Sequence, residues 1–152
     1  MSVKKIYIGA DSAGFALKGE LIEHLKELGY TVVDCGTDST ASCHYPDFAA
    51  AVCHGVLEDG ENCYGVLVCG TGVGMSMCAN KYKGIRAALC GDTYSAKMTR
   101  QHNDANVLCM GARVIGSCLA TDILDSFLSH EFEGGRHATR VAMMSEIENG
   151  SK

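Results

Sequence analysis

Hydrophobic positions in this chain fall into two alternating patterns. Short apolar runs, which are typical of β-strands, are each followed by a longer segment with apolar side chains three or four positions apart. The first strand is expected from Val3 to Ile8. The helix after it carries leucines at positions 17, 21, 25 and 28 on one face, and it ends at Gly29.

This alternation repeats along the chain. The run at residues 65–69 is apolar throughout, as expected for a strand that is buried on both faces of a parallel sheet. A last helix after Gly135 presents Val141, Met144 and Ile147. The other strands are expected at residues 31–33, 85–89 and 107–110, with helices that begin near Asp47, after the glycine loop at 70–74, near Asp92 and after residue 110.

Five strands that alternate with helices predict an α/β fold. Parallel neighbours need a crossover connection, and such crossovers are right-handed. We therefore expect a doubly wound, five-stranded parallel sheet, flavodoxin-like or Rossmann-like, with an extra C-terminal helix. A length of 152 residues without repeats fits one domain over residues 1–152. Ligands of such folds bind at the carboxyl ends of the strands.

Composition and charge narrow the range of partners. Apolar residues make up 47% of the chain and charged residues 20%, as in ordinary globular proteins. A net charge of −5 argues against nucleic-acid binding, which needs a dense basic face. The apolar run after Lys4-Lys5 is too short for a signal sequence, and no segment has the length of a membrane span. We expect a cytoplasmic protein without a membrane or nucleic-acid partner.

The nine cysteines are expected to be free thiols. They are spread along the chain with an odd total and no C-x-x-C pair, unlike the disulfide framework of a secreted protein. Cysteines in apolar runs, such as Cys109, behave as small hydrophobes, so we predict eight of them to be buried thiols in a reducing compartment. Cys43-His44 and Cys53-His54 match no usual zinc spacing, and no metal site is predicted.

The loop after the third strand, Cys69-Gly70-Thr71-Gly72-Val73-Gly74, is the most informative segment. Its three glycines let backbone N–H groups turn toward a ligand at the start of a helix, so the loop can hold an anion or oxyanion. A thiol beside such donors is expected to have a lowered pKa, which makes Cys69 a candidate reactive group. The dinucleotide fingerprint would place its third glycine one position later, and the Walker loop would end in Gly-Lys-Ser/Thr.

Two other polar segments offer side chains for chemistry, although each also has a simple structural explanation. Asp11 and Ser12, after the first strand, could cap the following helix. His102, in the segment Arg100–Asp104, could belong to a helix C-cap. Histidine is nevertheless the side chain best suited to carry protons at neutral pH, and we expect His102 in the strand-end region with the thiol.

Arg136 and Arg140 lie four residues apart on one face of the last helix. Like charges at this spacing repel by roughly a few tenths of a kcal/mol, so the pair suggests that an anion binds between them. A phosphate group is the expected ligand, because arginine binds phosphate with two parallel hydrogen bonds. A solvated helix face is the alternative explanation.

Together these segments resemble the B type of ribose-5-phosphate isomerase, and the resemblance runs over almost the whole chain. It implies an enzyme without a cofactor that interconverts ribose 5-phosphate and ribulose 5-phosphate through ring opening and a cis-enediolate. The matching segments are Cys69–Gly74, Arg100–Asp104 and Gly134–His137, with Gly36-Thr37, Tyr45-Pro46, Ala79-Asn80-Lys81, Gly84-Ile85-Arg86 and the pattern around Arg113.

The resemblance also implies a role for each matching residue. Cys69 corresponds to the base that moves a proton from C2 to C1, Thr71 to a residue that helps to move the proton between the oxygens, and His102 to the group that opens the sugar ring. Sites of this family lie between subunits, which implies a homodimer, or a tetramer, with shared active sites. The other matches are the enediolate-oxygen site (Gly70, Gly72, Gly74 and Asn103), the sugar contacts (Asp11 and Tyr45) and the phosphate ligands (Arg113, Arg136 and Arg140).

One position departs from the family pattern, and it bears on the substrate. The family usually has Asp-His after the first strand, whereas this chain has Asp11-Ser12. The missing imidazole is the one that contacts the phosphate or ring end of the sugar. Ser12 therefore affects either affinity or the choice of sugar, and it leaves the base and the oxyanion loop unchanged.

Three alternatives stay open at this point. The nearest is isomerisation of a six-carbon sugar phosphate, such as allose 6-phosphate or galactose 6-phosphate; the galactose enzymes divide the motifs between two kinds of subunit, whereas this chain holds all of them. A second is a flavodoxin-like module that binds FMN or another phosphorylated ligand without catalysis. A third is thiol redox chemistry, with Cys63 or Cys78 as the partner of Cys69.

Overall fold

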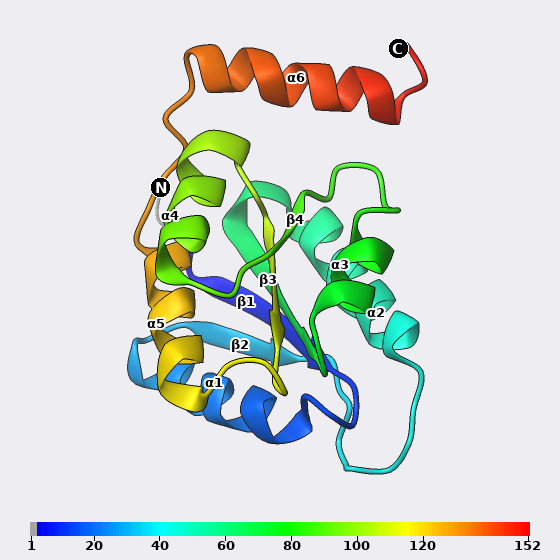
Figure 1. Cartoon of the computed structure of the whole chain (residues 1–152), viewed down its shortest axis with the longest axis vertical. Coiled ribbons are helices and arrows are strands. Elements are labelled where there is room, and N and C mark those ends of the chain that lie inside the picture. Colours follow the sequence, from blue (N-terminus) through cyan, green and yellow to red (C-terminus); the bar gives the residue numbers. More distant parts are fainter. Residues whose placement is uncertain (1–2) are drawn as a thin grey trace.

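The structure is a computed structural model that describes residues 3–152; residues 1 and 2, which the single-domain prediction also spans, lie outside the described residues. The chain alternates strands and helices along most of its length (Figure 1). In chain order the elements are β1 (Lys5–Ala10), α1 (Phe15–Glu27), β2 (Thr31–Asp34), α2 (Tyr45–Asp59), the short 3₁₀ helix η1 (Gly60–Asn62), β3 (Cys63–Cys69), α3 (Val73–Ala79), β4 (Ala87–Leu89), α4 (Thr93–Asn103), β5 (Val107–Gly111), α5 (Ser117–Leu128) and α6 (Arg136–Glu148).

The five strands form one parallel sheet in the order β2-β1-β3-β5-β4, which confirms the predicted α/β fold. Strand β3 lies at the centre, where it pairs with β1 on one side and with β5 on the other. The last two strands exchange places relative to chain order, so that β5 is internal and the three-residue β4 is at the edge. This placement follows from how α3 and α4 cross the sheet, which hydrophobic periodicity does not reveal.

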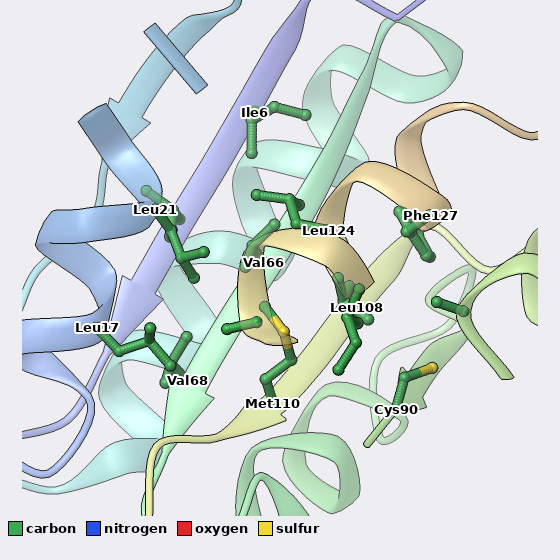
Figure 2. Close-up of a cluster of buried hydrophobic side chains, with 14 of the residues drawn as sticks. Ile6, Leu17, Leu21, Val66, Val68, Cys90, Leu108, Met110, Leu124 and Phe127 are labelled. Carbon is green, nitrogen blue, oxygen red and sulfur yellow. The ribbon is translucent and has the colours of Figure 1, made fainter. Parts of the chain in front are cut away.

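Side chains that alternate along β3 supply both halves of the core. Val66 and Val68 face α1 and α5, where they pack with Leu21, Leu124 and Phe127 (Figure 2). The intervening Leu67 and Cys69 face α2 and α3 on the other side of the sheet. Burial on both faces explains why this strand is apolar throughout, as predicted.

Helix α6 stands apart from this core. It lies beyond α4, at the end of the molecule where the strands begin (Figure 1). His137 is its only buried residue, whereas Met144 is 42% exposed and Ile147 is 61% exposed. The amphipathic pattern of this helix therefore leaves an apolar face that residues 3–152 do not fully cover.

The prediction of eight buried structural thiols is partly wrong. Cys53, Cys63, Cys90 and Cys109 are buried, and burial raises the pKa of Cys53 to about 12 and that of Cys63 and Cys90 to about 11. The other four are more accessible because they lie at strand or helix ends, or in a loop, rather than inside apolar strands. Cys35, Cys43 and Cys78 are half-buried and Cys118 is exposed.

Between residues 3 and 152, no helix combines the length and the apolar character that a membrane crossing requires.

Candidate active site

Two loops meet at the carboxyl ends of β1 and β3, the switch point at which ligands of such sheets bind. The backbone N–H of Asp11 donates to the carbonyl oxygen of Val68 at 3.2 Å. A Cβ atom on Gly14 would lie 2.5 Å from the same oxygen, so only glycine allows this close approach. The Asp11 carboxylate accepts a hydrogen bond from the Gly14 N–H at 3.0 Å, and the adjacent Ser12 is half-buried.

The sulfur of Cys69 faces the glycine loop. Cys69 is the last residue of β3 and only 5% exposed, and its Sγ accepts a hydrogen bond from the Gly72 N–H at 3.1 Å. Gly72 has a φ of 79°, a left-handed conformation that turns this N–H back toward the sulfur. The structure thus brings the thiol together with one of the predicted backbone donors, the Gly72 N–H.

Further predicted residues surround the same loop. The Tyr45 ring, from the first turn of α2, lies against Gly74, where an added Cβ would be 2.8 Å from its ring atoms. The Arg113 side chain, from the loop after β5, reaches Gly70, where an added Cβ would be 3.5 Å from a guanidinium nitrogen. Thr71 is exposed on the loop, and its hydroxyl accepts from the Val73 N–H at 3.3 Å. The carboxyl end of the sheet therefore holds a thiol, a backbone N–H donor, a phenol and a guanidinium.

The expectation that His102 lies beside the thiol in the strand-end region is wrong within one chain. Helix α4 starts after the carboxyl end of β4 and runs back along the sheet, so its C-terminal end lies where the strands begin (Figure 1). His102 and Asn103 are the last two residues of this helix. Arg86, which precedes β4, confirms this position, because its Nε donates to the carbonyl oxygen of Asn103 at 3.1 Å.

A second group of predicted residues lies at the opposite end of the sheet, where the strands begin. The His102 ring stacks on that of His137, with centroids 4.0 Å apart and planes within 8°. Arg136 and Arg140 are exposed on α6, and neither forms an ion pair with any residue in the described range 3–152. Burial lowers the pKa of His137, and the neighbouring His102 ring and Arg136 guanidinium lower it further.

The end of α4 is held by a network that the sequence did not indicate. Asp104, the C-cap, has a left-handed φ of 48°, unusual for a residue other than glycine. Its carboxylate pairs with Arg86 at 3.2 Å and with the buried Arg100 at 3.0 Å. These contacts fix the turn that follows His102 and Asn103.

Glu133 and His137 also lie at this end of the sheet, and the sequence analysis assigned a role to neither of them. The carboxylate of Glu133 approaches His102 at 3.9 Å and His137 at 3.6 Å. The four-residue spacing between Glu133 and His137 was the available signal, because it brings the two side chains together across the start of a helix.

Comparison with known proteins gives a consistent result across the chain. A family model described as Ribose/Galactose Isomerase matches residues 6–144. Ribose-5-phosphate isomerase B of Escherichia coli is 49% identical over 146 residues, which cover 96% of this chain and 97% of that protein. D-erythrulose-4-phosphate isomerase of Pectobacterium atrosepticum is 46% identical over 148 residues, which cover 97% of each chain.

Solved structures agree with these relatives. Ribose-5-phosphate isomerase B of Clostridium thermocellum matches with a TM-score of 0.94 and 49% identity, over 97% of this chain and 99% of that one. The enzyme of Mycoplasma genitalium with bound ribulose-5-phosphate matches with a TM-score of 0.93 and 41% identity, over 98% and 99% of the two chains.

Proposed function

Since this chain belongs to the ribose/galactose isomerase family of aldose–ketose isomerases, we propose that it interconverts ribose 5-phosphate and ribulose 5-phosphate. Relatives with this named activity match nearly the full length of the chain. Family membership also sets aside the flavodoxin-like binding module as an explanation of the glycine loop.

The reacting carbons lie at the Cys69 loop. Cys69 removes the proton from C2 of the open-chain sugar and returns a proton to C1, while Thr71 assists the transfer between the two oxygens. The observation that supports this assignment is the hydrogen bond from the Gly72 N–H to the Cys69 sulfur, which places one loop donor against the thiol. Donors fixed in this way stabilise the negative oxygen of the enediolate, and no cofactor takes part.

Ring opening and phosphate binding require the second group of residues. His102 opens the furanose ring, and Asn103 contributes to the enediolate-oxygen site. Arg136 and Arg140 bind the phosphate together with Arg113 of the first group, and Asp11, Ser12 and Tyr45 contact the sugar. Free guanidinium groups suit this role, because bidentate pairing with phosphate oxygens is favourable and directional.

Each subunit holds the Cys69 group and the His102 group at opposite ends of its strands, so the complete site is assembled in a homodimer. In a two-fold dimer that joins the Cys69 loop of one subunit to His102 of the other, this contact occurs twice, so the dimer holds two complete sites. The exposed apolar face of α6 supports such an assembly. It borders a groove of about 670 Å³ against β4, lined by residues that include Ile85, Ala88, Met144 and Ile147.

Replacement of Cys69 by alanine tests the base directly. Ketose formation from ribose 5-phosphate should fall by about 10²-fold to 10⁴-fold or more, since that is the usual contribution of a general base. Phosphate affinity, measured by calorimetric titration, should be preserved. The matched control is Cys109→Ala, a buried thiol in the adjacent strand β5, which should keep its turnover. Normal turnover by the Cys69 variant would mean that another group is the base.

Substrate choice is tested by relative rates. Ser12 stands at the position that usually carries histidine, and one relative at 46% identity is named for a four-carbon sugar phosphate. We propose a preference for ribose 5-phosphate, so kcat/KM for this sugar should exceed that for allose 6-phosphate and for D-erythrulose 4-phosphate. A clear preference for either competitor contradicts the proposed substrate while leaving the isomerase chemistry intact.

The proposal includes a cytoplasmic location. All nine cysteines are free thiols in the structure, and free thiols are typical of a reducing compartment.

A further inference from the structure

His102, Glu133 and His137 form a compact cluster of three potential metal ligands. The Nε2 atoms of the two histidines both face one carboxylate oxygen, Glu133 Oε2, at 3.9 Å from His102 and 3.6 Å from His137. The three ligand atoms lie within 4.8 Å of one another. The imidazoles are stacked with their planes within 8°, so their in-plane lone pairs are nearly parallel, and the His102 ring, whose side chain is 37% exposed, has to turn for both to point at one ion.

The environment of His137 indicates that something else binds there. His137 is only 5% exposed, and its Nε2 has no hydrogen-bond partner among residues 3–152. Its distance of 3.6 Å from the carboxylate is too long for a hydrogen bond. A buried ring nitrogen without a partner costs free energy, so this atom is available for a ligand that the chain itself does not supply.

We propose that His102, Glu133 and His137 bind one Zn²⁺ ion. Zinc bonds to nitrogen and oxygen of about 2.0–2.2 Å place neighbouring ligands of a tetrahedral site about 3.3 Å apart. The separations of 3.6 and 3.9 Å from the carboxylate oxygen therefore need to shorten by a few tenths of an ångström, together with a turn of the His102 ring. Two histidines and one glutamate are an established zinc ligand set, which leaves the fourth position to water.

The ion can enter this cluster, and its charge is partly balanced there. The side chains of His102 and Glu133 are 37% and 48% exposed, so the cluster opens to solvent on their side. Glu133 supplies a negative charge, and it precedes Gly134-Gly135, where the backbone is adaptable. The cations of Arg136 and Arg140 oppose zinc binding, but both are exposed and water screens their repulsion.

Zinc at this position should inhibit the enzyme. An imidazole nitrogen bound to zinc cannot carry a proton, so His102 would be withdrawn from ring opening. This consequence rests on the proposed function, whereas ion binding itself does not. The bound ion is thus an inhibitor of a reaction that needs no metal.

Calorimetric titration of the full chain with ZnCl₂ tests the site without reference to activity. The variants are Glu133→Gln and His137→Asn, with Glu131→Gln as the matched control on a neighbouring exposed acid. We expect tight binding of one ion per chain by the unmodified protein and the control, and an affinity at least about tenfold lower in the two variants. All four proteins carry the same nine thiols, so the difference isolates the cluster. Equal zinc binding by all of them overturns the proposal.

An isomerase assay with added zinc tests the consequence, each protein being compared with its own zinc-free rate. The unmodified protein and Glu131→Gln should be inhibited, and Glu133→Gln should resist at the same zinc concentration. Equal inhibition of all variants would assign the effect to thiols and overturn the proposed inhibition. Binding at the cluster without any loss of turnover would instead refute the role of His102 in ring opening, while the metal site would stand.

Discussion

Gly72 holds the thiol loop in a conformation that other residues adopt only with strain. Its φ is 79°, and an added Cβ would lie 2.5 Å from Leu89 and 2.9 Å from the Met110 backbone. The contact with Met110 cannot be relieved without moving the loop, because that neighbour is main chain. The N–H that faces the Cys69 sulfur therefore depends on the absence of a side chain at this position.

Replacement of Gly72 by alanine should lower kcat by about 10²-fold to 10³-fold, the usual cost of losing one oxyanion donor. None of the proposed phosphate ligands is among the nearest neighbours of Gly72, so KM should change much less. Steady-state kinetics with ribose 5-phosphate measure both values. The control is Gly91→Ala, whose added Cβ meets no atom within 4 Å. Unchanged kcat in the Gly72 variant would contradict the role of the loop.

The two ends of α4 are fixed by different means, and the first of them is sensitive to pH. Asp92 caps the helix, with its carboxylate accepting from the Ser95 N–H at 2.6 Å and from the Ser95 hydroxyl at 2.8 Å. These hydrogen bonds, the backbone one first, hold the pKa of Asp92 below its usual value. The ionised cap therefore stabilises the folded state above the unfolded pKa of about 3.9, and this contribution is lost as the pH falls through the lower folded pKa.

Comparison of the unmodified protein with Asp92→Asn isolates that charge, since asparagine is also a good N-cap. At pH 7 the variant should have the lower unfolding temperature. The gap should be small, because the cap is exposed, and it should close as the pH is lowered toward 3. Thermal unfolding followed by circular dichroism across this range provides the measurement. A gap that stays constant, or that widens in acid, contradicts the assigned pKa direction.

Helix α6 is the element through which we expect subunits to meet. Replacement of Ile147 by glutamate places a charge on its exposed apolar face, beside the groove against β4. Burying an unpaired carboxylate costs several kcal/mol, so the dimer should dissociate at micromolar concentration. Light scattering after size exclusion gives the mass. The control is Glu146→Gln on the same helix; a variant at Ile147 that stays dimeric would place the interface elsewhere.

At the scale of the whole molecule, the two groups of site residues predict complementation between inactive subunits. Cys69→Ala and His102→Asn should each be inactive alone. In a mixture of equal amounts that has exchanged subunits, half of the dimers are mixed, and each mixed dimer holds one intact site. Activity should then recover to about a quarter of normal, as the two-fold symmetry of the dimer requires. A mixture without activity would mean that the site is not shared between subunits.

The sequence predicted local structure better than relations between distant elements. The local geometry of the Cys69 loop could be predicted because its strand, glycines and thiol are consecutive. The position of His102 could not, because it depends on the direction in which α4 returns along the sheet. The edge position of β4 depends likewise on how two crossovers pass one another. The cluster at Glu133 and His137 requires the stacking of rings from two helices, which periodicity does not encode.

In the proposed dimer, the separation of the thiol from the histidine within each chain makes turnover a reporter of self-association. At concentrations well below the dissociation constant of the pair, the number of working catalysts rises with the square of the amount of protein. Dilution should then reduce the rate per milligram, and saturating substrate should restore it, because a ligand that bridges two chains also holds them together.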